Sequence, residues 1–246
     1  MKKLYDIKYG EQKENLLDIY IPDKNNFKTV VWIHGGGLEE GDKNGIHFAE
    51  DLLKLGYGLV TINYRLYPNA VFPDYIIDAA KAVGYVFRHI KGYGGTGEIY
   101  VTGQSAGAYI TMMLCLNDKY LKAEGIEVGQ VAGFIADSAQ LTTHFNVLRE
   151  RGIDTRLERI EEAAPLYYLK EKMAFKRLLL IYYTDDVICR PEQNKLFYRS
   201  AVRLMPEKDI EILELSGTHV NSSERRNENG EFGFVNELAK FIEKGK

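Results

Sequence analysis

The 246-residue chain has little of what marks disulfide-rich, metal-binding or nucleic-acid-binding proteins. Its two cysteines, Cys115 and Cys189, are too few for a disulfide framework, and neither lies in a C-x-x-C or metal-ligand spacing. Thirty-two lysines and arginines against 35 aspartates and glutamates give a net charge of −3, which offers no attraction to nucleic acid or to an anionic membrane. We therefore expect no metal, no cofactor and no nucleic-acid partner.

Long apolar runs are also missing. No uninterrupted hydrophobic segment has the length of a transmembrane helix, and residues 1–6 carry two lysines without the apolar stretch of a signal peptide. The six prolines and 23 glycines do not gather into a linker or a low-complexity tract. The expectation is a cytoplasmic protein that acts without a membrane, as a monomer or a homodimer.

What the chain does contain is a series of short apolar runs. They are rich in Val, Ile and Leu without strict alternation, which is typical of strands buried on both faces of a parallel sheet. These runs are 29–33, 58–62, 98–102, 131–136, 178–182 and 210–215. Residues 16–20 mix polar and apolar side chains, and we expect them to form an antiparallel strand near the N-terminal edge of the sheet.

Segments with helical periodicity separate these runs. The clearest is 74–90, and further candidates are 106–116, 192–204 and 232–242. Strands that alternate with helices predict an α/β protein, a three-layer α/β/α sandwich around a mostly parallel sheet. Residues 141–172 interrupt the alternation, carry many charges, and are expected to form a small helical, cap-like insertion over one end of the sheet.

A glycine-flanked serine stands at one strand-to-helix junction. Gly103-Gln104-Ser105-Ala106-Gly107 follows the expected strand 98–102 and begins the expected helix 106–116. In this context G-x-S-x-G is a nucleophile elbow, a tight turn that exposes the serine hydroxyl beside the positive end of a helix. The alternative is a glycine-rich turn with an incidental serine, which the strand and helix on either side disfavour.

A second glycine cluster follows the expected strand 29–33. In His34-Gly35-Gly36-Gly37 the three glycines free the backbone to direct N–H groups into a cavity, as an oxyanion hole requires. The expected donors are the amides of Gly36 and Gly37, joined by that of Ala106 after the serine. His34 is expected to brace this loop rather than to act as a base.

A serine nucleophile needs a base, and five histidines are available. His219 follows the expected strand 210–215, in a loop at the same edge of the sheet as Ser105, and we expect it to be the base. His144, at the start of the insertion, is the alternative. The other three are His34 in the oxyanion loop and His47 and His89 on expected helices before the elbow.

The base needs an orienting acid, for which the residues leave a choice. Asp185 and Asp186 both follow the expected strand 178–182, so that one can face the histidine while the other caps the turn or faces solvent. Asp137, after the preceding strand, is a third candidate that fits a turn cap equally well.

Together these features resemble the α/β-hydrolase superfamily, and within it the HGGG-type esterases related to hormone-sensitive lipase and to bacterial carboxylesterases. The resemblance implies an eight-stranded sheet and a triad in the order Ser105, Asp186, His219. It extends over nearly the whole chain from about residue 15. Further matching segments are Leu17-Asp18-Ile19-Tyr20-Ile21-Pro22, Gly41-Asp42-Lys43, Asn63-Tyr64-Arg65-Leu66-Tyr67-Pro68 and Phe72-Pro73-Asp74.

The resemblance also selects among the acids. Members of the family commonly read G-T-x-D-x-x-V-P-x-x-Q, and counting back seven residues from Gln193 gives Asp186. Two residues depart from the family pattern. Leu38 replaces the usual aromatic residue after the glycines and is expected to reshape the acyl side of the pocket. Tyr183 replaces a glycine and is expected either to project towards the site or to pack beneath it.

The leading hypothesis is a serine hydrolase that cleaves carboxylic esters, with short acyl chains or acylated sugars, through an acyl-enzyme. An amide hydrolase, such as an arylformamidase or small peptidase, is the alternative, and an inactive hydrolase-fold receptor is a third hypothesis. Because the triad is drawn from residues 105, 186 and 219, dividing the chain would separate nucleophile from base. We therefore expect one α/β-hydrolase domain over residues 1–246.

Overall fold

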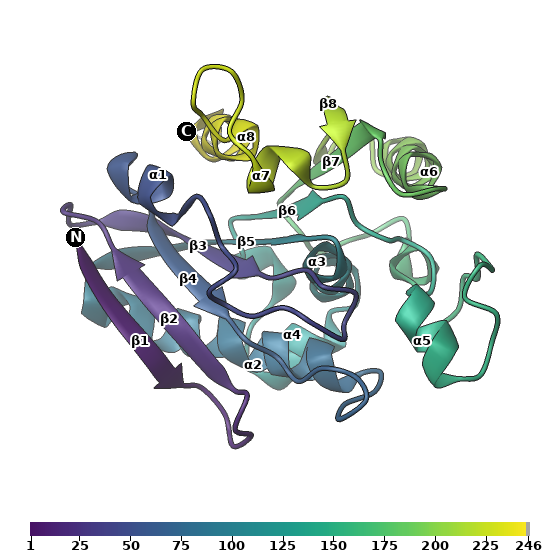
Figure 1. Cartoon of the computed structure of the whole chain (residues 1–246), viewed down its shortest axis with the longest axis horizontal. Helices are drawn as coiled ribbons and strands as arrows, with labels where there is room; N and C mark the ends of the chain where they lie inside the picture. The colour runs from purple at the N-terminus through teal and green to yellow at the C-terminus, as the bar shows by residue number, and fades with distance from the viewer. Residues whose placement is uncertain (245–246) are drawn as a thin grey trace.

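The computed structural model describes residues 1–244, which build one sheet of eight strands in the order β1-β2-β4-β3-β5-β6-β7-β8 (Figure 1). The strands are β1 (Lys2–Lys8), β2 (Leu16–Ile21), β3 (Phe27–Ile33), β4 (Gly58–Ile62), β5 (Gly95–Gln104), β6 (Gly133–Asp137), β7 (Arg177–Asp185) and β8 (Asp209–Thr218). Strand β2 is antiparallel to its neighbours β1 and β4, and the other neighbouring pairs are parallel. The prediction of a mostly parallel α/β sheet is confirmed.

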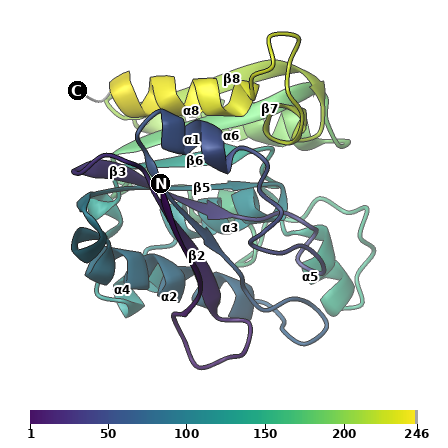
Figure 2. The same ribbon diagram turned by 60° about the vertical axis from the view of Figure 1, so that its left-hand side comes forward.

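Helices cover both faces of the sheet (Figures 1 and 2). One face carries α1 (Ala49–Lys54) and α8 (Gly233–Lys244). The other carries α2 (Asp74–His89), α3 (Ala106–Leu116), α4 (Lys119–Ala123) and α6 (Arg190–Leu204). The short helices α5 (Phe145–Glu150) and α7 (Asn221–Glu224) lie in connections that follow β6 and β8. Within residues 1–244, no helix has the length and apolarity needed to cross a membrane.

The core consists of two apolar layers, one on each face of the sheet. In β3, Val31 and Ile33 belong to the layer under α2 and α3, whereas Val30 and Trp32 belong to the layer under α1 and α8. All four side chains are buried, because successive residues of a strand point to opposite faces and both faces are covered. This explains why the strand reads as an apolar run without alternation.

The strands and helices expected from the sequence are all present, with ends displaced by a few residues. Strand β1 was not expected, because its mostly exposed residues carry little apolar signal at the edge of the sheet. The expectation that His47 lies on a helix was wrong: it lies in a bend before α1. Within 141–172 only α5 and a 3₁₀ turn at Pro165–Tyr168 are helical, so this segment is less helical than expected.

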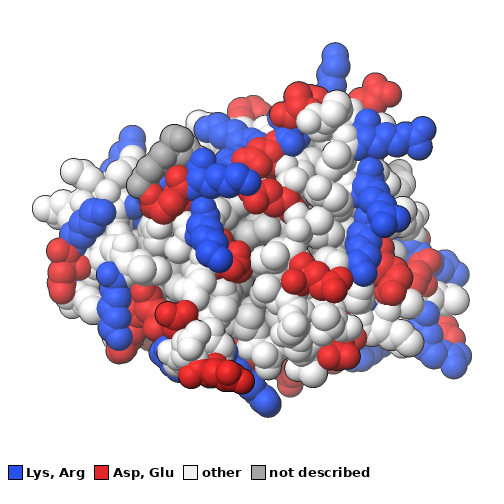
Figure 3. All heavy atoms as spheres, turned by 90° about the horizontal axis from the view of Figure 1, so that it is seen from above, with Lys and Arg blue, Asp and Glu red and all other residues white. Residues whose placement is uncertain are grey.

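Lysines and arginines are interspersed with aspartates and glutamates on the face above α8, which Figure 3 shows. This face therefore has no broad field of one sign that would attract a polyanion. The expected absence of a nucleic-acid partner stays a prediction.

A buried ion pair ties the loop after β3 to the N-terminal hairpin. The Nζ atom of Lys43 lies 2.8 Å from Oδ1 of Asp18 on β2 and 2.9 Å from Oδ1 of Asp6 on β1. The side chain of Lys43 is 5% exposed and that of Asp18 is fully buried. Removing one partner of such a pair leaves the other charge uncompensated inside the protein.

We predict that Lys43→Met lowers the free energy of unfolding by about 3–5 kcal/mol, because Asp18 stays buried without its cation. Urea unfolding followed by circular dichroism measures the change. The matched control is Lys13→Met, whose exposed ammonium lies 3.6 Å from Glu14; we expect a change below about 0.5 kcal/mol there. Equal effects of the two substitutions would contradict the anchoring role of Lys43.

Candidate active site

Ser105 lies on a strained turn between β5 and α3. Its backbone has φ 53° and ψ −115°, a conformation that residues other than glycine rarely adopt. Two backbone hydrogen bonds fix the turn: the Ser105 amide donates to the Asp137 carbonyl at 2.8 Å, and the Ser105 carbonyl accepts from the Tyr109 amide at 3.0 Å. The turn is therefore held by β6 on one side and by the first turn of α3 on the other.

The two glycines of the elbow allow backbones to approach more closely than any side chain permits. A Cβ atom on Gly107 would lie 2.0 Å from the Ile33 carbonyl oxygen, and one on Gly103 would lie 2.4 Å from the carbonyl group of Gly107. The start of α3 is thus pressed against the end of β3. The G-x-S-x-G spacing follows from this contact as much as from the serine itself.

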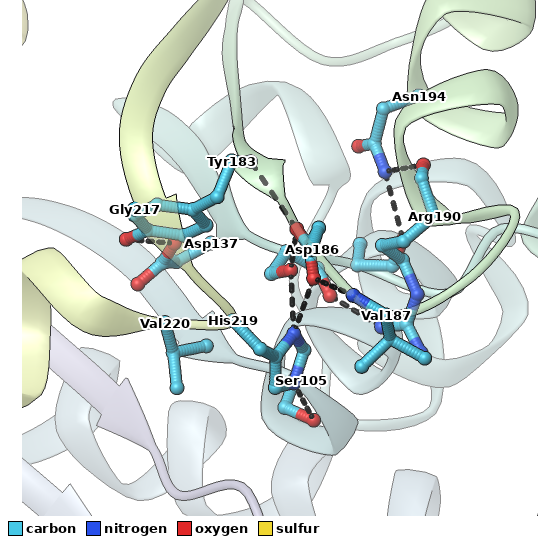
Figure 4. Close-up of polar contacts among 12 residues, drawn as sticks. Ser105, Asp137, Tyr183, Asp186, Val187, Arg190, Asn194, Gly217, His219 and Val220 are labelled. Atoms are coloured by element: carbon cyan, nitrogen blue, oxygen red, sulfur yellow. Dashed lines mark hydrogen bonds and ion pairs between the residues drawn. The ribbon is translucent and has the colours of Figure 1, made fainter.

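The three side chains expected to form a triad lie within hydrogen-bonding distance of one another (Figure 4). Nε2 of His219 is 2.9 Å from Oγ of Ser105, and Nδ1 of His219 is 2.5 Å from Oδ1 of Asp186. Asp186 directly follows β7 and His219 directly follows β8. The carboxyl ends of three parallel strands therefore present the serine, the acid and the histidine at one edge of the sheet.

The carboxylate of Asp186 is held by four donors. Its oxygens accept from His219, from the Ser138 hydroxyl, and from the amides of Val187 at 2.8 Å and Tyr183 at 3.2 Å. Burial raises the pKa of Asp186, but the hydrogen bonds from His219 and Ser138 outweigh this effect, so the pKa stays below its ordinary value. An ionised Asp186 holds the proton of His219 on Nδ1 and leaves Nε2 free to accept from Ser105.

The structure places the competing acids and base elsewhere. The exposed side chain of Asp185 contacts the Thr184 hydroxyl at 3.3 Å. The fully buried Asp137 accepts from the Tyr183 hydroxyl at 2.9 Å and the Ser223 hydroxyl at 2.9 Å. The buried His144 caps α5 by accepting from the Asn146 amide at 3.2 Å, and burial lowers its pKa well below the ordinary value.

The loop expected to form the oxyanion hole faces the same site. Gly36 and Gly37 have φ values of 100° and 62°, and both line a cavity together with Ser105. Within residues 1–244, the amides of Gly36, Gly37 and Ala106 donate no hydrogen bond to another protein atom. Three free donors beside the serine hydroxyl are what a developing oxyanion requires.

His34 braces this loop, as expected. Its Nδ1 lies 2.7 Å from the Gly35 carbonyl oxygen, and its ring stacks on that of Tyr64 with centroids 4.3 Å apart. Tyr64 in turn donates to the His34 carbonyl at 2.9 Å. Burial lowers the pKa of His34 to about 4, so the ring is uncharged at neutral pH.

Sequence reasoning missed Ser138, which directly follows β6. Its hydroxyl hydrogen-bonds Oδ2 of Asp186 and lies 2.9 Å from Nδ1 of His219. Ser138 therefore contacts both the acid and the base that are expected to act with Ser105. Its φ of 63° is the left-handed conformation that favours glycine. The only signal in the sequence is its place one residue after Asp137, at the end of a buried strand.

The two departures from the family pattern have different outcomes. Tyr183 packs beneath the site, where its buried ring bears the hydroxyl that contacts Asp137. The expectation for Leu38 was wrong: its side chain is fully buried in the core, and it does not line the cavity. The aromatic ring beside Gly37 is instead that of Phe145, the first residue of α5.

The cavity at Ser105 has a volume of about 330 Å³. Its remaining wall consists of the segment after Asp186, the segment after His219 and two glutamates of the oxyanion loop. The lining residues are Gly35, Gly36, Gly37, Glu39, Glu40, Gln104, Ser105, Phe145, Val187, Arg190, His219, Val220 and Glu224. Within residues 1–244, no group of three or more His, Cys, Asp and Glu side chains is arranged to hold a metal ion.

Comparisons with known proteins agree with this architecture. Residues 17–200 match the BD-FAE family. The probable isoprenylcysteine alpha-carbonyl methylesterase ICMEL1 of Oryza sativa subsp. japonica is 28% identical over 77% of this chain and 51% of its own length. The kynurenine formamidase-like hydrolase fscH of Fusarium equiseti is 26% identical over 82% of each chain.

A solved structure described as a truncated form of carbohydrate esterase from gut microbiota superposes with a TM-score of 0.76. It is 17% identical and covers 100% of this chain and 96% of its own, a likeness that shows the fold. The chain spans about half the length, or less, of the first curated relatives it matches.

A pH dependence of stability follows from Asp137. Burial raises the pKa of Asp137 to about 7, hydrogen bonds from Ser223 and Tyr183 oppose this, and the charges of Asp186 and Glu224 add to it. Between the ordinary value of 3.8 and about 7, the folded protein keeps a proton that the unfolded chain has released. The resulting stabilisation is complete below about pH 4 and is lost as the pH rises through about 7.

We predict that wild type loses stability relative to Asp137→Asn by about 1.4 kcal/mol per pH unit over this interval, because asparagine does not titrate. Urea unfolding of both proteins between pH 4.5 and 8 measures the difference. A difference that is independent of pH would rule out a raised pKa at Asp137.

Proposed function

The chain belongs to the BD-FAE family of α/β-hydrolases, and we propose that it is a serine hydrolase that cleaves carboxylic esters through an acyl-enzyme. The observation that carries the proposal is the chain of hydrogen bonds from Ser105 through His219 to Asp186, together with three unpaired backbone amides beside Ser105. The esterase names of a curated relative and of a structural neighbour support it.

In the proposed first step, Ser105 attacks the ester carbonyl while Nε2 of His219 takes its proton. Asp186 holds the histidine tautomer and stabilises the imidazolium that forms. The amides of Gly36, Gly37 and Ala106 donate hydrogen bonds to the tetrahedral oxyanion and stabilise its charge. His219 then gives its proton to the leaving alcohol, and the acyl group stays on Ser105.

The second step mirrors the first. A water molecule replaces the alcohol, His219 removes its proton, and attack on the acyl-enzyme releases the carboxylic acid and restores Ser105. Every proton is handled by His219, because the other buried histidines, His34 and His144, hydrogen-bond backbone groups away from the serine.

The proposed substrates are small. A cavity of about 330 Å³, with Phe145 against Gly37, suits a short acyl chain better than a long one. An alcohol part with further hydroxyl groups, such as a sugar, can donate hydrogen bonds to the carboxylates of Glu40 and Glu224 on the wall of the same cavity. The carbohydrate esterase among the structural neighbours supports acylated sugars.

An amide hydrolase is the second candidate. The relative fscH, whose name describes it as kynurenine formamidase-like, aligns with this chain over most of both lengths. The same triad and oxyanion hole serve an amide, provided that His219 protonates the departing amine. A comparison of kcat/KM for the ester phenyl formate with kcat/KM for the corresponding amide, formanilide, distinguishes an ester hydrolase from an amide hydrolase. An inactive receptor is disfavoured, because serine, histidine and acid are all in place.

We predict that Ser105→Ala lowers kcat for p-nitrophenyl acetate by about 10⁴-fold or more, because the nucleophile is lost. A fluorophosphonate should add one adduct to wild type, located on Ser105 by mass spectrometry, and none to the variant. Unchanged circular dichroism controls for the fold. Retained turnover together with a retained adduct would show that another residue is the nucleophile.

We predict a positioning role for Ser138. Removing its hydroxyl in Ser138→Ala should lower kcat for p-nitrophenyl acetate about tenfold with KM unchanged, because Asp186 and His219 lose a shared hydrogen-bond partner. Ser138→Gly is the matched control, since glycine suits the φ of 63° and preserves or raises stability. A normal kcat in Ser138→Gly would mean that only the backbone conformation matters.

A further inference from the structure

Arg190, near the active site, has hydrogen-bond donors without partners. It is the first residue of α6, and it is 4% exposed. Its Nη1 donates to the carbonyl oxygen of Ser138, Nε is buried without a hydrogen-bond partner, and no hydrogen bond from Nη2 is found within residues 1–244. Figure 4 shows Arg190 beside Val187 and Asp186. A buried guanidinium usually has its donors satisfied, because each unmade hydrogen bond costs free energy.

Arg190 lies where two cavities meet. A second cavity, of about 540 Å³, adjoins the one at Ser105, and Phe145, Val187 and Arg190 line both. Its other walls come from the 141–172 segment and from the start of α6. These other lining residues are Gln140, Thr155, Arg156, Glu158, Ile188, Cys189 and Gln193. Arg190 therefore stands in the wall that the two cavities share.

Two carboxylates partly offset the cost of burying the charge of Arg190. Burial lowers its pKa to about 10, so it stays cationic at neutral pH, and Asp186 and Glu158 are the carboxylates that oppose this effect. Both carboxylates accept hydrogen bonds from other residues, Asp186 from His219 and Glu158 from Gln193 at 2.9 Å. The site thus has a cation that nearby carboxylates partly offset, together with an unused N–H donor.

Such a site favours a neutral acceptor over an anion. A carboxylate brought to Arg190 meets the charges of Asp186 and Glu158, and it must pass Glu40 and Glu224 on the wall of the first cavity. A carbonyl or ester oxygen accepts from the free donors without that repulsion. A hydrogen bond to a charged donor is also stronger than one between neutral groups.

We propose that Arg190 and the second cavity form a subsite for an uncharged carbonyl oxygen that the substrate carries in addition to its scissile ester. The subsite deepens the proposed ester hydrolysis, and it depends on that activity occurring in the first cavity. The substrate class is a diester or keto ester, whose second carbonyl accepts from Nη2 of Arg190 while Ser105 attacks the first.

The test compares esters of matched length on wild type. Dimethyl succinate, dimethyl glutarate and dimethyl adipate carry a second neutral carbonyl, methyl heptanoate carries none, and monomethyl glutarate carries a carboxylate. After correction for two equivalent esters, kcat/KM for the best diester should exceed that for methyl heptanoate about tenfold. The monomethyl ester should be slower than the diester. Provided that wild type hydrolyses these esters, a diester no faster than methyl heptanoate, or a faster monomethyl ester, overturns the proposal.

Variants then locate the preference. The diester preference is the ratio of kcat/KM for the best diester to that for methyl heptanoate. Both Arg190→Gln and Arg190→Met should reduce this ratio to about one, although glutamine keeps one donor for the Ser138 carbonyl. Arg156→Gln is the matched control, because this exposed arginine lines the same cavity and pairs with Asp154; its preference should equal that of wild type. A preference that survives both Arg190 variants rejects Arg190 as its source.

A binding measurement separates this proposal from the proposed function. In Ser105→Ala, dimethyl glutarate should bind about tenfold more tightly than methyl heptanoate by calorimetry, and this difference should vanish when Arg190→Gln is added. If wild type hydrolyses none of the esters, the proposed function fails while the binding difference still supports the subsite. Equal binding of both esters to Ser105→Ala rejects the subsite even if hydrolysis is fast.

Discussion

The contact between the start of α3 and the end of β3 is the constraint on which the site depends. Because Gly107 has no side chain, its backbone lies against the Ile33 carbonyl, and the chain must turn sharply at Ser105 to enter the helix. The same contact places the loop after β3 beside the helix N-terminus, so that the amides of Gly36 and Gly37 join that of Ala106. One close approach of backbones therefore aligns the proposed nucleophile with the proposed oxyanion hole.

A layer of polar contacts beneath the triad joins the three strand ends that carry it. Asp137 at the end of β6 accepts through its carbonyl from Ser105 and through its carboxyl from Tyr183 and Ser223. Ser223 lies on α7, four residues after His219, so the position of the histidine depends on a side chain from another strand. Ser138 makes the corresponding contact to Asp186. The geometry of the triad is thus a property of neighbouring strand ends rather than of three isolated loops.

Features that are local in sequence were predictable. Buried parallel strands read as apolar runs, and the elbow, the oxyanion glycines and the loop of His219 each follow such a run directly. The meeting of Ser105 and His219 with an acid therefore followed from topology, whereas the choice of Asp186 among three aspartates came from the family resemblance. Features that depend on the packing of distant segments were not predictable. The ring beside Gly37 is Phe145 and not the residue after the glycines, and Leu38, whose φ is 66°, lies in the core. The edge strand β1 was missed because its residues are mostly exposed.

The difference between features that are local in sequence and features that depend on distant packing has a physical basis, and it affects which substrate the site selects. The chemistry needs a few atoms held rigidly, and short loops after buried strands supply them at low conformational cost. Recognition needs a wall around the rest of the substrate, and here that wall is assembled from α5, the residues before Pro165 and the start of α6. A change in the 141–172 segment can therefore alter which ester fits without moving the triad. The residues around the elbow determine the type of reaction. Substrate specificity depends instead on the cavity-lining segments, which are distant in sequence and come together only in the folded chain.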